Sequence, residues 1–288
     1  MGSSSGTSVN IQWSTAGTAT ISLYELNSYG CDSTVSTTLN VLQTPSPSIT
    51  GTTPICAGQT AIYTSPYVTG NTYTWNVTGG NVLSTNNNSV TVYWPSAGSG
   101  TVSLTENNTS TCNNNDILNI VIAPQPAPLI SGTGTVCTGT SSSYSVVTQT
   151  AGNTYSWNVI GGSIIGSSTG TSVNIQWSTA GTATISLYES NGFGCDSTIS
   201  LNITVLQTPS PAITGTTPIC AGQTVTYSTP NVSGNTYTWN VTGGNVLSIS
   251  NNTVTVYWAT AGSGTISVTE NNTSTCSSND RSEEHTSE

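Results

Sequence analysis

Large apolar side chains alternate with small polar ones in short runs along most of this chain. In the run 236–241 the apolar positions are Tyr237, Trp239 and Val241. Successive side chains of a strand point to opposite faces of its sheet, so a period of two predicts a strand with one buried face. A glycine-rich turn at 261–264 separates the next two alternating runs. No run shows helical periodicity, so we expect strands throughout.

The sequence repeats itself at two distances. At the longer distance, about 164 residues, Trp13 matches Trp177 and Cys112 matches Cys276. A weaker period of about 82 residues recurs in the motif N-T-Y-T/S-W-N-V, whose tryptophans are Trp75, Trp157 and Trp239. We therefore expect tandem domains of about 82 residues each, an arrangement typical of rods and stalks.

The spacing of strands and turns predicts the fold class. About seven short strands per repeat, turns every 8–12 residues and a Cys…Trp…Cys order indicate an all-β chain of tandem immunoglobulin-like β-sandwich repeats. Proline-rich segments between the repeats end ladder pairing and favour extended connections. The expected parts are the C-terminal half of a domain at 1–43, domains at 46–124 and 127–207, a domain lacking its last strand at 209–280, and a tail at 281–288.

The tail differs in composition from the rest of the chain. It holds the only Arg, the only His and three of the eleven acids. Asp116 is followed by the apolar run I-L-N-I-V-I-A, whereas its counterpart Asp280 is followed by R-S-E-E-H-T-S-E. This octapeptide resembles the translation of a common short-read sequencing adapter, so we expect a non-native tail; a genuine acidic tail is the alternative. Without a final strand, the last domain is expected to expose an edge that favours aggregation.

Charge excludes several functional classes. Before residue 281 the chain contains no Lys, Arg or His and eight acids. Nucleic acids and anionic membranes are bound through basic side chains, so neither partner is expected. A nucleophilic Ser or Cys needs a neighbouring base, and without Lys or His only the few carboxylates could serve. We therefore expect neither an enzyme nor a cofactor, and no apolar stretch is long enough to span a membrane.

The recurring acids are expected to be structural. One glutamate stands at an equivalent position in each repeat, and a lone carboxylate does not provide the pair that glycosidases use. Calcium is the alternative ligand for these acids, but no D-x-D-x-D-G loop is present, and we predict no metal site. The acids concerned are Glu25, Glu106, Glu189, Glu270, Asp32, Asp116, Asp196 and Asp280.

Seven cysteines recur with the repeats. Regular spacings of about 57 residues, without His, favour disulfides over zinc. The expected pairs lie within each domain, and they are Cys56–Cys112, Cys137–Cys195 and Cys220–Cys276. Cys31 is then left unpaired by truncation; a functional free thiol is the alternative. Disulfides persist in oxidising compartments, so we expect an exported protein located outside the cell or at its surface.

Aromatic residues fall into two groups by strand face. Trp13, Trp94, Trp177 and Trp258 occupy inward positions of the V-x-V/I-x-W strand, and we expect them in the cores. Tyr93 and Tyr257 point outward on the same strand and are candidate glycan contacts. The triplets D-S-T at 32–34 and 196–198 resemble an O-glycosylation sequence of some bacteria with type IX export, which makes Ser33 and Ser197 candidate sites.

Together these motifs resemble one family. The order I-x-G-x-x-x-I/V-C-x-G, Y-T/S-W-N-V, V-x-V/I-x-W and a second Cys is similar to the PKD-like immunoglobulin-fold repeats of secreted bacterial surface proteins, over residues 1–280. The W-D-F-G-D-G motif of better-known PKD domains is absent.

The resemblance implies a structural or adhesive stalk or spacer in a large protein exported by type IX secretion. Its expected partners are neighbouring repeats and extracellular glycans or surface proteins. The alternative from another class is a carbohydrate-binding accessory region of a secreted polysaccharide-degrading enzyme.

Overall fold

The computed structural model describes residues 5–110, 112–273 and 276–287, the last five through the backbone alone. Every regular element in these ranges is a β-strand, as the alternating pattern predicts. The chain divides into two compact units, one of residues 1–125 with 193–195 and one of residues 126–192 with 196–288. None of the described segments forms a helix of the length and hydropathy needed to cross a membrane.

The N-terminal hairpin is a two-stranded antiparallel sheet. It pairs β1 (Gly17–Leu26) with β2 (Asp32–Val41), from Gly17↔Val41 to Leu26↔Asp32. No second sheet of the described residues before 42 covers it, and Trp13 remains 41% exposed. The expectation that Trp13 is a core residue is therefore wrong, because its counterparts are buried only between two sheets.

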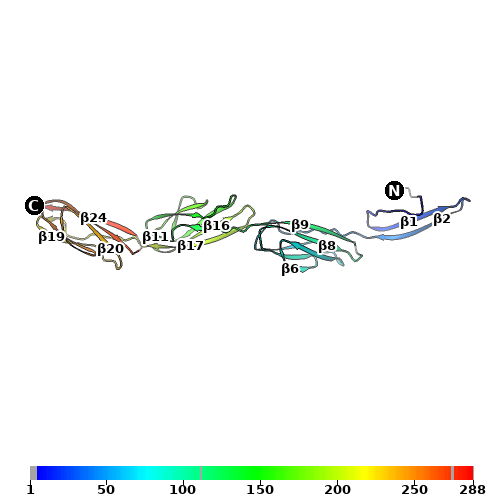
Figure 1. The fold of residues 1–288 in the computed structure, drawn as a ribbon, viewed down its shortest axis with the longest axis horizontal. Coiled ribbons are helices and arrows are strands. Elements are labelled where there is room, and N and C mark those ends of the chain that lie inside the picture. Colours follow the sequence, from blue (N-terminus) through cyan, green and yellow to red (C-terminus); the bar gives the residue numbers. More distant parts are fainter. Residues whose placement is uncertain (1–4, 111, 274–275, 288) are drawn as a thin grey trace. The chain divides into compact units, whose positions relative to one another are not determined.

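The first sandwich (55–123) consists of two facing sheets (Figure 1). One sheet has the order β3-β9-β8-β5 and the other β4-β7-β6. Antiparallel pairing dominates, and β3 joins β9 in parallel. The strands are β3 (Ile55–Cys56), β4 (Gln59–Thr64), β5 (Thr72–Thr78), β6 (Asn81–Asn86), β7 (Ser89–Trp94), β8 (Gly98–Asn107) and β9 (Asn113–Ala123).

The second sandwich (130–206) has the sheets β11-β17-β16-β13 and β10-β12-β15-β14. Its strands are β10 (Ile130–Ser131), β11 (Thr135–Cys137), β12 (Ser141–Val146), β13 (Thr154–Ile160), β14 (Ser163–Ile165), β15 (Ser172–Gln176), β16 (Gly181–Ser190) and β17 (Asp196–Leu206).

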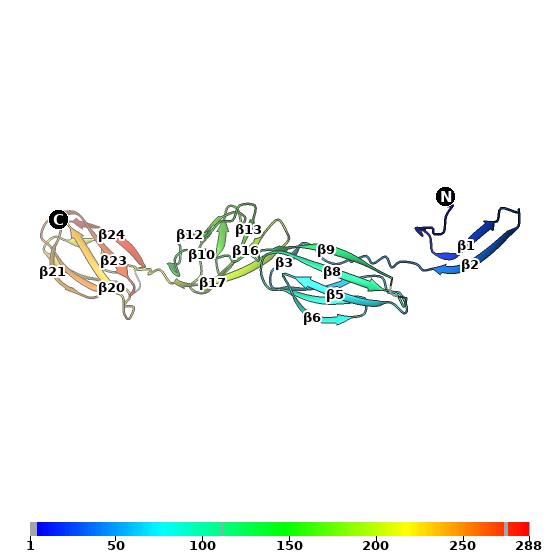
Figure 2. The ribbon, with the colours of Figure 1, turned by 45° about the vertical axis from the view of Figure 1, so that its right-hand side comes forward.

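The third sandwich (219–287) repeats the topology of the first, with sheets β18-β24-β23-β20 and β19-β22-β21 (Figure 2). Its strands are β18 (Ile219–Cys220), β19 (Gln223–Ser228), β20 (Thr236–Thr242), β21 (Asn245–Ser250), β22 (Thr253–Trp258), β23 (Gly262–Asn271) and β24 (Ser277–Ser287).

One tryptophan forms the centre of each core. Trp94 is fully buried at the end of β7, and its ring meets that of Tyr63 edge-on with centroids 6.1 Å apart. Gly100 is required beside it, because a Cβ at that position would collide with the Trp94 ring. The same edge-on pair recurs as Tyr144–Trp177 and Tyr227–Trp258. The expected core role of these three tryptophans is confirmed.

The expectation that the third domain lacks its last strand is wrong. Strand β24 continues through residues 281–287 and pairs with β23 from Asn271↔Ser277 to Gly262↔Thr286. On its other side it pairs in parallel with β18. Ladder hydrogen bonds join backbone groups, so a strand of different side chains can occupy this position. The open edge that we expected at β23 is therefore covered.

Candidate functional site

Two disulfides join cysteines of successive sandwiches. Cys56 bonds to Cys195 with a Cα–Cα distance of 5.6 Å, and Cys137 bonds to Cys276 with a distance of 5.8 Å. Both bonds span 139 residues of sequence. The free cysteines are Cys31, Cys112 and Cys220. Our expected pairs within each domain are therefore wrong, and neither Cys112 nor Cys220 is in a disulfide.

Strand length explains why cysteines of one sandwich do not pair. Cys56 lies beside Ala123, the last residue of β9, whereas Cys112 immediately precedes the first residue of β9. A strand of 11 residues, at about 3.3 Å each, places these cysteines about 35 Å apart. A disulfide requires a Cα–Cα distance of about 4.4–6.8 Å. The two cysteines of one repeat, about 57 residues apart in sequence, thus lie at opposite ends of one long strand. The second sandwich has the same arrangement around β17.

The recurring glutamates are buried and hydrogen bonded. Glu106 is 2% exposed, and its Oε1 accepts a hydrogen bond of 2.7 Å from Asn71 Nδ2, the first residue of the N-T-Y motif. A buried carboxylate is costly without such a donor, so the asparagine and the glutamate belong together. The equivalent pairs are Asn153–Glu189 and Asn235–Glu270. Glu25, on the N-terminal hairpin, is exposed.

The tyrosine and tryptophan of the N-T-Y-T/S-W-N-V motif form hydrogen bonds with the backbone of nearby loops. The Tyr73 hydroxyl accepts a hydrogen bond from the Val68 amide and donates one to the Pro66 carbonyl. Trp75 Nε1 donates to the Asn87 carbonyl. Burial raises the pKa of Tyr73, so this hydroxyl stays protonated at neutral pH. Trp157 and Trp239 make the equivalent bonds, which assigns the motif to loop anchoring.

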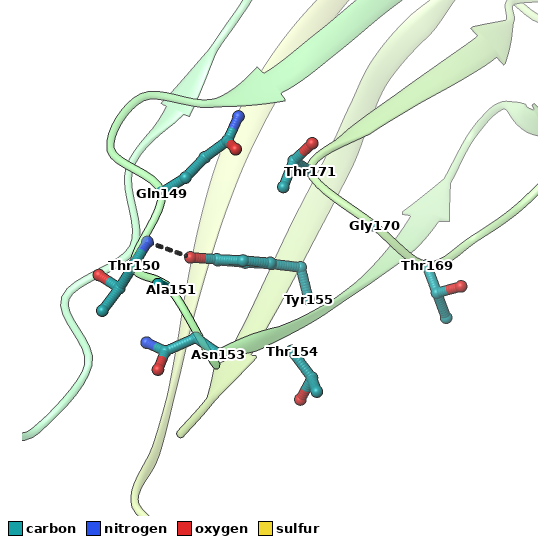
Figure 3. Close-up of a pocket in the computed structure, with 9 residues that line it drawn as sticks. All are labelled: Gln149, Thr150, Ala151, Asn153, Thr154, Tyr155, Thr169, Gly170 and Thr171. Atoms are coloured by element: carbon teal, nitrogen blue, oxygen red, sulfur yellow. Dashed lines mark hydrogen bonds between the residues drawn. The ribbon is translucent and has the colours of Figure 1, made fainter. Parts of the chain in front are cut away.

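A pocket of about 560 Å³ opens beside this motif in the second sandwich (Figure 3). The loop at 149–154 and the segment 169–171 form its walls, with the Tyr155 ring between them. The Tyr155 hydroxyl accepts a hydrogen bond of 2.9 Å from the Thr150 amide. All nine lining residues are uncharged, and none of them is an Asp, Glu, His, Lys or Cys.

The aspartates are dispersed. Asp116 Oδ2 accepts a hydrogen bond of 2.7 Å from the Ile49 amide, and Asp280 does the same for Ile213 at 2.8 Å. Both bonds attach the segment that enters a sandwich to its last strand. Asp32 and Asp196 are exposed. In the part of the chain that the structure describes, no three His, Cys, Asp or Glu side chains gather as metal ligands would.

The candidate glycan contacts lie on outer sheet faces. Tyr93 is half-buried on β7, between Thr60 and Asn81 of the neighbouring strands. Tyr257 has the equivalent place on β22, between Thr224 and Asn245. In the second sandwich the residue before the core tryptophan is Gln176.

The candidate O-glycosylation residues differ in exposure. Ser33 is exposed on β2, opposite Glu25. Ser197 is half-buried on β17, opposite the buried Glu189. A modifying enzyme needs access to the hydroxyl, so Ser33 is the more accessible candidate of the two.

Comparison with known proteins identifies the repeats. The family model of the PKD-like domain matches residues 42–120, 123–205 and 206–285. No curated protein matches the chain.

Solved structures that match the chain include the Dpr2 Ig1–Ig2 domains in complex with DIP-Theta, at 11% identity and a TM-score of 0.31, covering 82% of this chain and 96% of that chain. They also include SGBP-B of Bacteroides ovatus, in complex with a mixed-linkage heptasaccharide, at 12% identity and a TM-score of 0.23, covering 85% and 71%. The chicken CNTN1 FN1–FN3 domains match at 10% identity and a TM-score of 0.29, covering 84% and 99%.

Proposed function

Because the chain belongs to the PKD-like domain family, we propose that it is a structural or adhesive repeat region, a stalk or spacer, of a large secreted or cell-surface bacterial protein. The observation that carries this proposal is the covalent connection of successive sandwiches by disulfides. The recurring buried acids support it, because protein donors already engage the carboxylates of Glu106, Glu189 and Glu270. We propose no catalysis in this chain.

Export is part of the same proposal. Two disulfides in a chain of this family are typical of an oxidising compartment. Type IX secretion, glycosylation at Ser33 or Ser197 and a non-native origin of residues 281–288 remain proposals that rest on sequence motifs. The proposed partners are neighbouring repeats and extracellular glycans or surface proteins.

A surface-capture measurement tests the spacer. A small binding domain is fused to the N-terminus, and the C-terminus is anchored to a bead that carries a dense polymer brush. We expect ligand-coated beads to be captured, because the chain presents the binding domain outside the brush. The control replaces the chain with a short flexible linker of the kind that stays within the brush. Equal capture by both would contradict the proposed function.

Glycan binding is the second candidate, favoured by Tyr93 and Tyr257 on outer sheet faces. Aromatic rings at exposed positions stack on sugar rings, and both tyrosines are partly accessible. Gel electrophoresis in the presence of insoluble glycans measures binding as retardation. Retardation that is lost in Tyr93→Ala with Tyr257→Ala, and retained in the matched Gln176→Ala control, favours an accessory glycan-binding region. Absence of retardation favours the spacer.

A further inference from the structure

The two disulfides close overlapping loops. Cys137 lies inside the loop that Cys56–Cys195 closes, and Cys195 lies inside the loop that Cys137–Cys276 closes. Every peptide bond between residues 56 and 276 is therefore bridged by at least one disulfide. This follows from the covalent connections alone and holds for any arrangement of the sandwiches in space.

The overlap creates short covalent paths through the chain. From Cys112 the backbone reaches Cys137 in about 25 residues, and the disulfide then leads directly to Cys276. The backbone alone needs about 164 residues for the same span. The Cys56–Cys195 disulfide gives a similar short path. From Cys56 the disulfide leads directly to Cys195, and the backbone then reaches Cys220 in about 25 residues. Any further repeat with the same two cysteines would add another step of this length.

Most residues of the path from Cys112 to Cys137 are already extended. Of the residues between Cys112 and Cys137, strand β9 supplies 11, and the short strands β10 and β11 supply further extended residues near Cys137. A residue in a strand already spans about 3.3 Å, close to the limit of about 3.6 Å for an extended chain. Tension can therefore lengthen the strand residues of this path only slightly, and the whole path cannot exceed its fully extended length.

Most of the cores lie off this path. In the second sandwich the buried side chains of Ile175, Trp177 and Ile185, in and next to β15 and β16, belong to the segment that the Cys137–Cys276 bond bypasses. The third sandwich is bypassed as far as β23, including Trp258 and Val268. A sandwich unfolds under load only if its backbone lengthens, and a bypassed backbone cannot do so.

We propose that the two disulfides carry tension past the sandwiches, so that the chain bears mechanical load without unfolding its cores. This rests on the proposed stalk function and deepens it, because it assigns the load to one short backbone segment and one disulfide for every two repeats. The chemistry of the partner does not matter to this function, because the covalent path depends only on the positions at which the load enters the chain.

Single-molecule stretching of the whole chain tests this proposal. DNA handles are attached at positions 113 and 277, both of which are exposed. In the oxidised protein the covalent path between the handles spans at most about 90 Å. After reduction the full backbone between the handles spans at most about 590 Å. We expect total extension of the oxidised chain to stay below about 90 Å, and stepwise extension beyond it after reduction.

Two matched variants identify the responsible bond. With Cys137→Ser and Cys276→Ser, the shortest path runs back through Cys56–Cys195, and the limit rises to about 500 Å. With Cys56→Ser and Cys195→Ser, the limit stays at about 90 Å. Extension of the oxidised unsubstituted chain beyond about 90 Å, or more than three free thiols in it, overturns the proposal. Neither outcome bears on surface capture, which tests the spacer function separately.

Discussion

The first and third sandwiches share most of their sequence but differ in the last strand. Opposite Val102 of β8, strand β9 carries Leu118, and it places Ile120 and Ile122 at the next two positions of that face. Opposite the equivalent Ile266 of β23, strand β24 carries Ser282, with Glu284 and Thr286 following in register. The two sandwiches thus have the same ladder but different residue types at the three equivalent positions of the last strand.

The comparison separates what shapes a sheet from what stabilises it. In the first sandwich, Ile120 and Ile122 belong to the buried core, with Leu118 packed against it. In the third sandwich, the described core side chains come from other strands and none comes from β24. The turn and the backbone ladder are sufficient to place a strand, whereas burial of its apolar face provides most of the free energy.

The largest expected effect concerns covalent continuity between sandwiches. A protease site inserted after Ala127, an exposed linker residue, cuts the chain between the first and second sandwiches. We expect the two fragments to migrate together in a non-reducing gel, because Cys56–Cys195 bridges the cut. They should separate after reduction, and without reductant in a Cys56→Ser variant. Separation of the unsubstituted protein without reductant would support pairing within each domain.

The next effect concerns the last strand itself. Replacing Ser282 by Leu, Glu284 by Ile and Thr286 by Ile gives β24 the apolar face of β9. Each fully buried side chain contributes about 1.5–3 kcal/mol, so we expect the free energy of unfolding of the third sandwich to rise by about 5 kcal/mol. Hydrogen exchange of the β23 amides measures this change, with the β8 amides as internal control. Unchanged protection of β23 would show that these positions are not part of the core.

The converse substitution sharpens the comparison from the other side. Ile120→Glu places a carboxylate at a position that is 1% exposed, and we expect it to cost several kcal/mol in the first sandwich alone. Ile120→Val is the matched control, with an expected cost of about 0.5–1.5 kcal/mol. Chemical denaturation of both variants gives the two values, and similar values for the two would refute the core assignment.

A smaller effect is expected to be shared by the two sandwiches. Glu106→Ala leaves the Asn71 amide without its acceptor, which costs about 1–3 kcal/mol in a buried site. Glu270→Ala does the same to Asn235 in the third sandwich. Glu106→Gln keeps an acceptor and should recover much of the loss, as thermal unfolding of each variant would show. A loss in only one sandwich would mean that the difference extends beyond the last strand.

The smallest effect is a dependence on alkaline pH. Burial raises the pKa of Tyr63, whose hydroxyl donates to the Thr52 carbonyl. The unfolded tyrosine titrates near pH 10, so its stabilising contribution is complete below that pH and is lost as the pH rises through the higher folded-state pKa. We expect stability to decline above about pH 10. Tyr63→Phe removes this group and should reduce the decline; an identical decline would assign it to other groups.

Much of each sandwich is predictable from local sequence. The alternation over 236–241 predicts β20, observed as Thr236–Thr242. The inward positions of Trp94, Trp177 and Trp258 follow from the same period, and all three are buried. Trp13 obeys the pattern and is nevertheless exposed, because burial also needs a second sheet, which a strand pattern does not supply.

The candidate site was predictable only in part. One glutamate and one N-T-Y motif recur in each repeat, which indicated that these residues have a shared role. The recurrence did not indicate that Asn71 and Glu106 form a hydrogen bond with each other. The cysteines carried two regular spacings, a shorter one within repeats and one of 139 residues between them. The shorter spacing suggested the wrong pairs, and only the second spacing corresponds to bonds.

The sequence by itself determined the strand content, the repeat length and the core residues of each sandwich, because a period of two is a local property that selects one buried face. The tertiary structure decided which cysteines bond and which residues complete the third sandwich. A disulfide depends on two Cα atoms coming within a few ångströms, and the length of β9 and β17 keeps the cysteines of one sandwich apart. A final strand depends on the backbone groups of its neighbour, which β23 presents to β24 regardless of the side chains that follow Asp280.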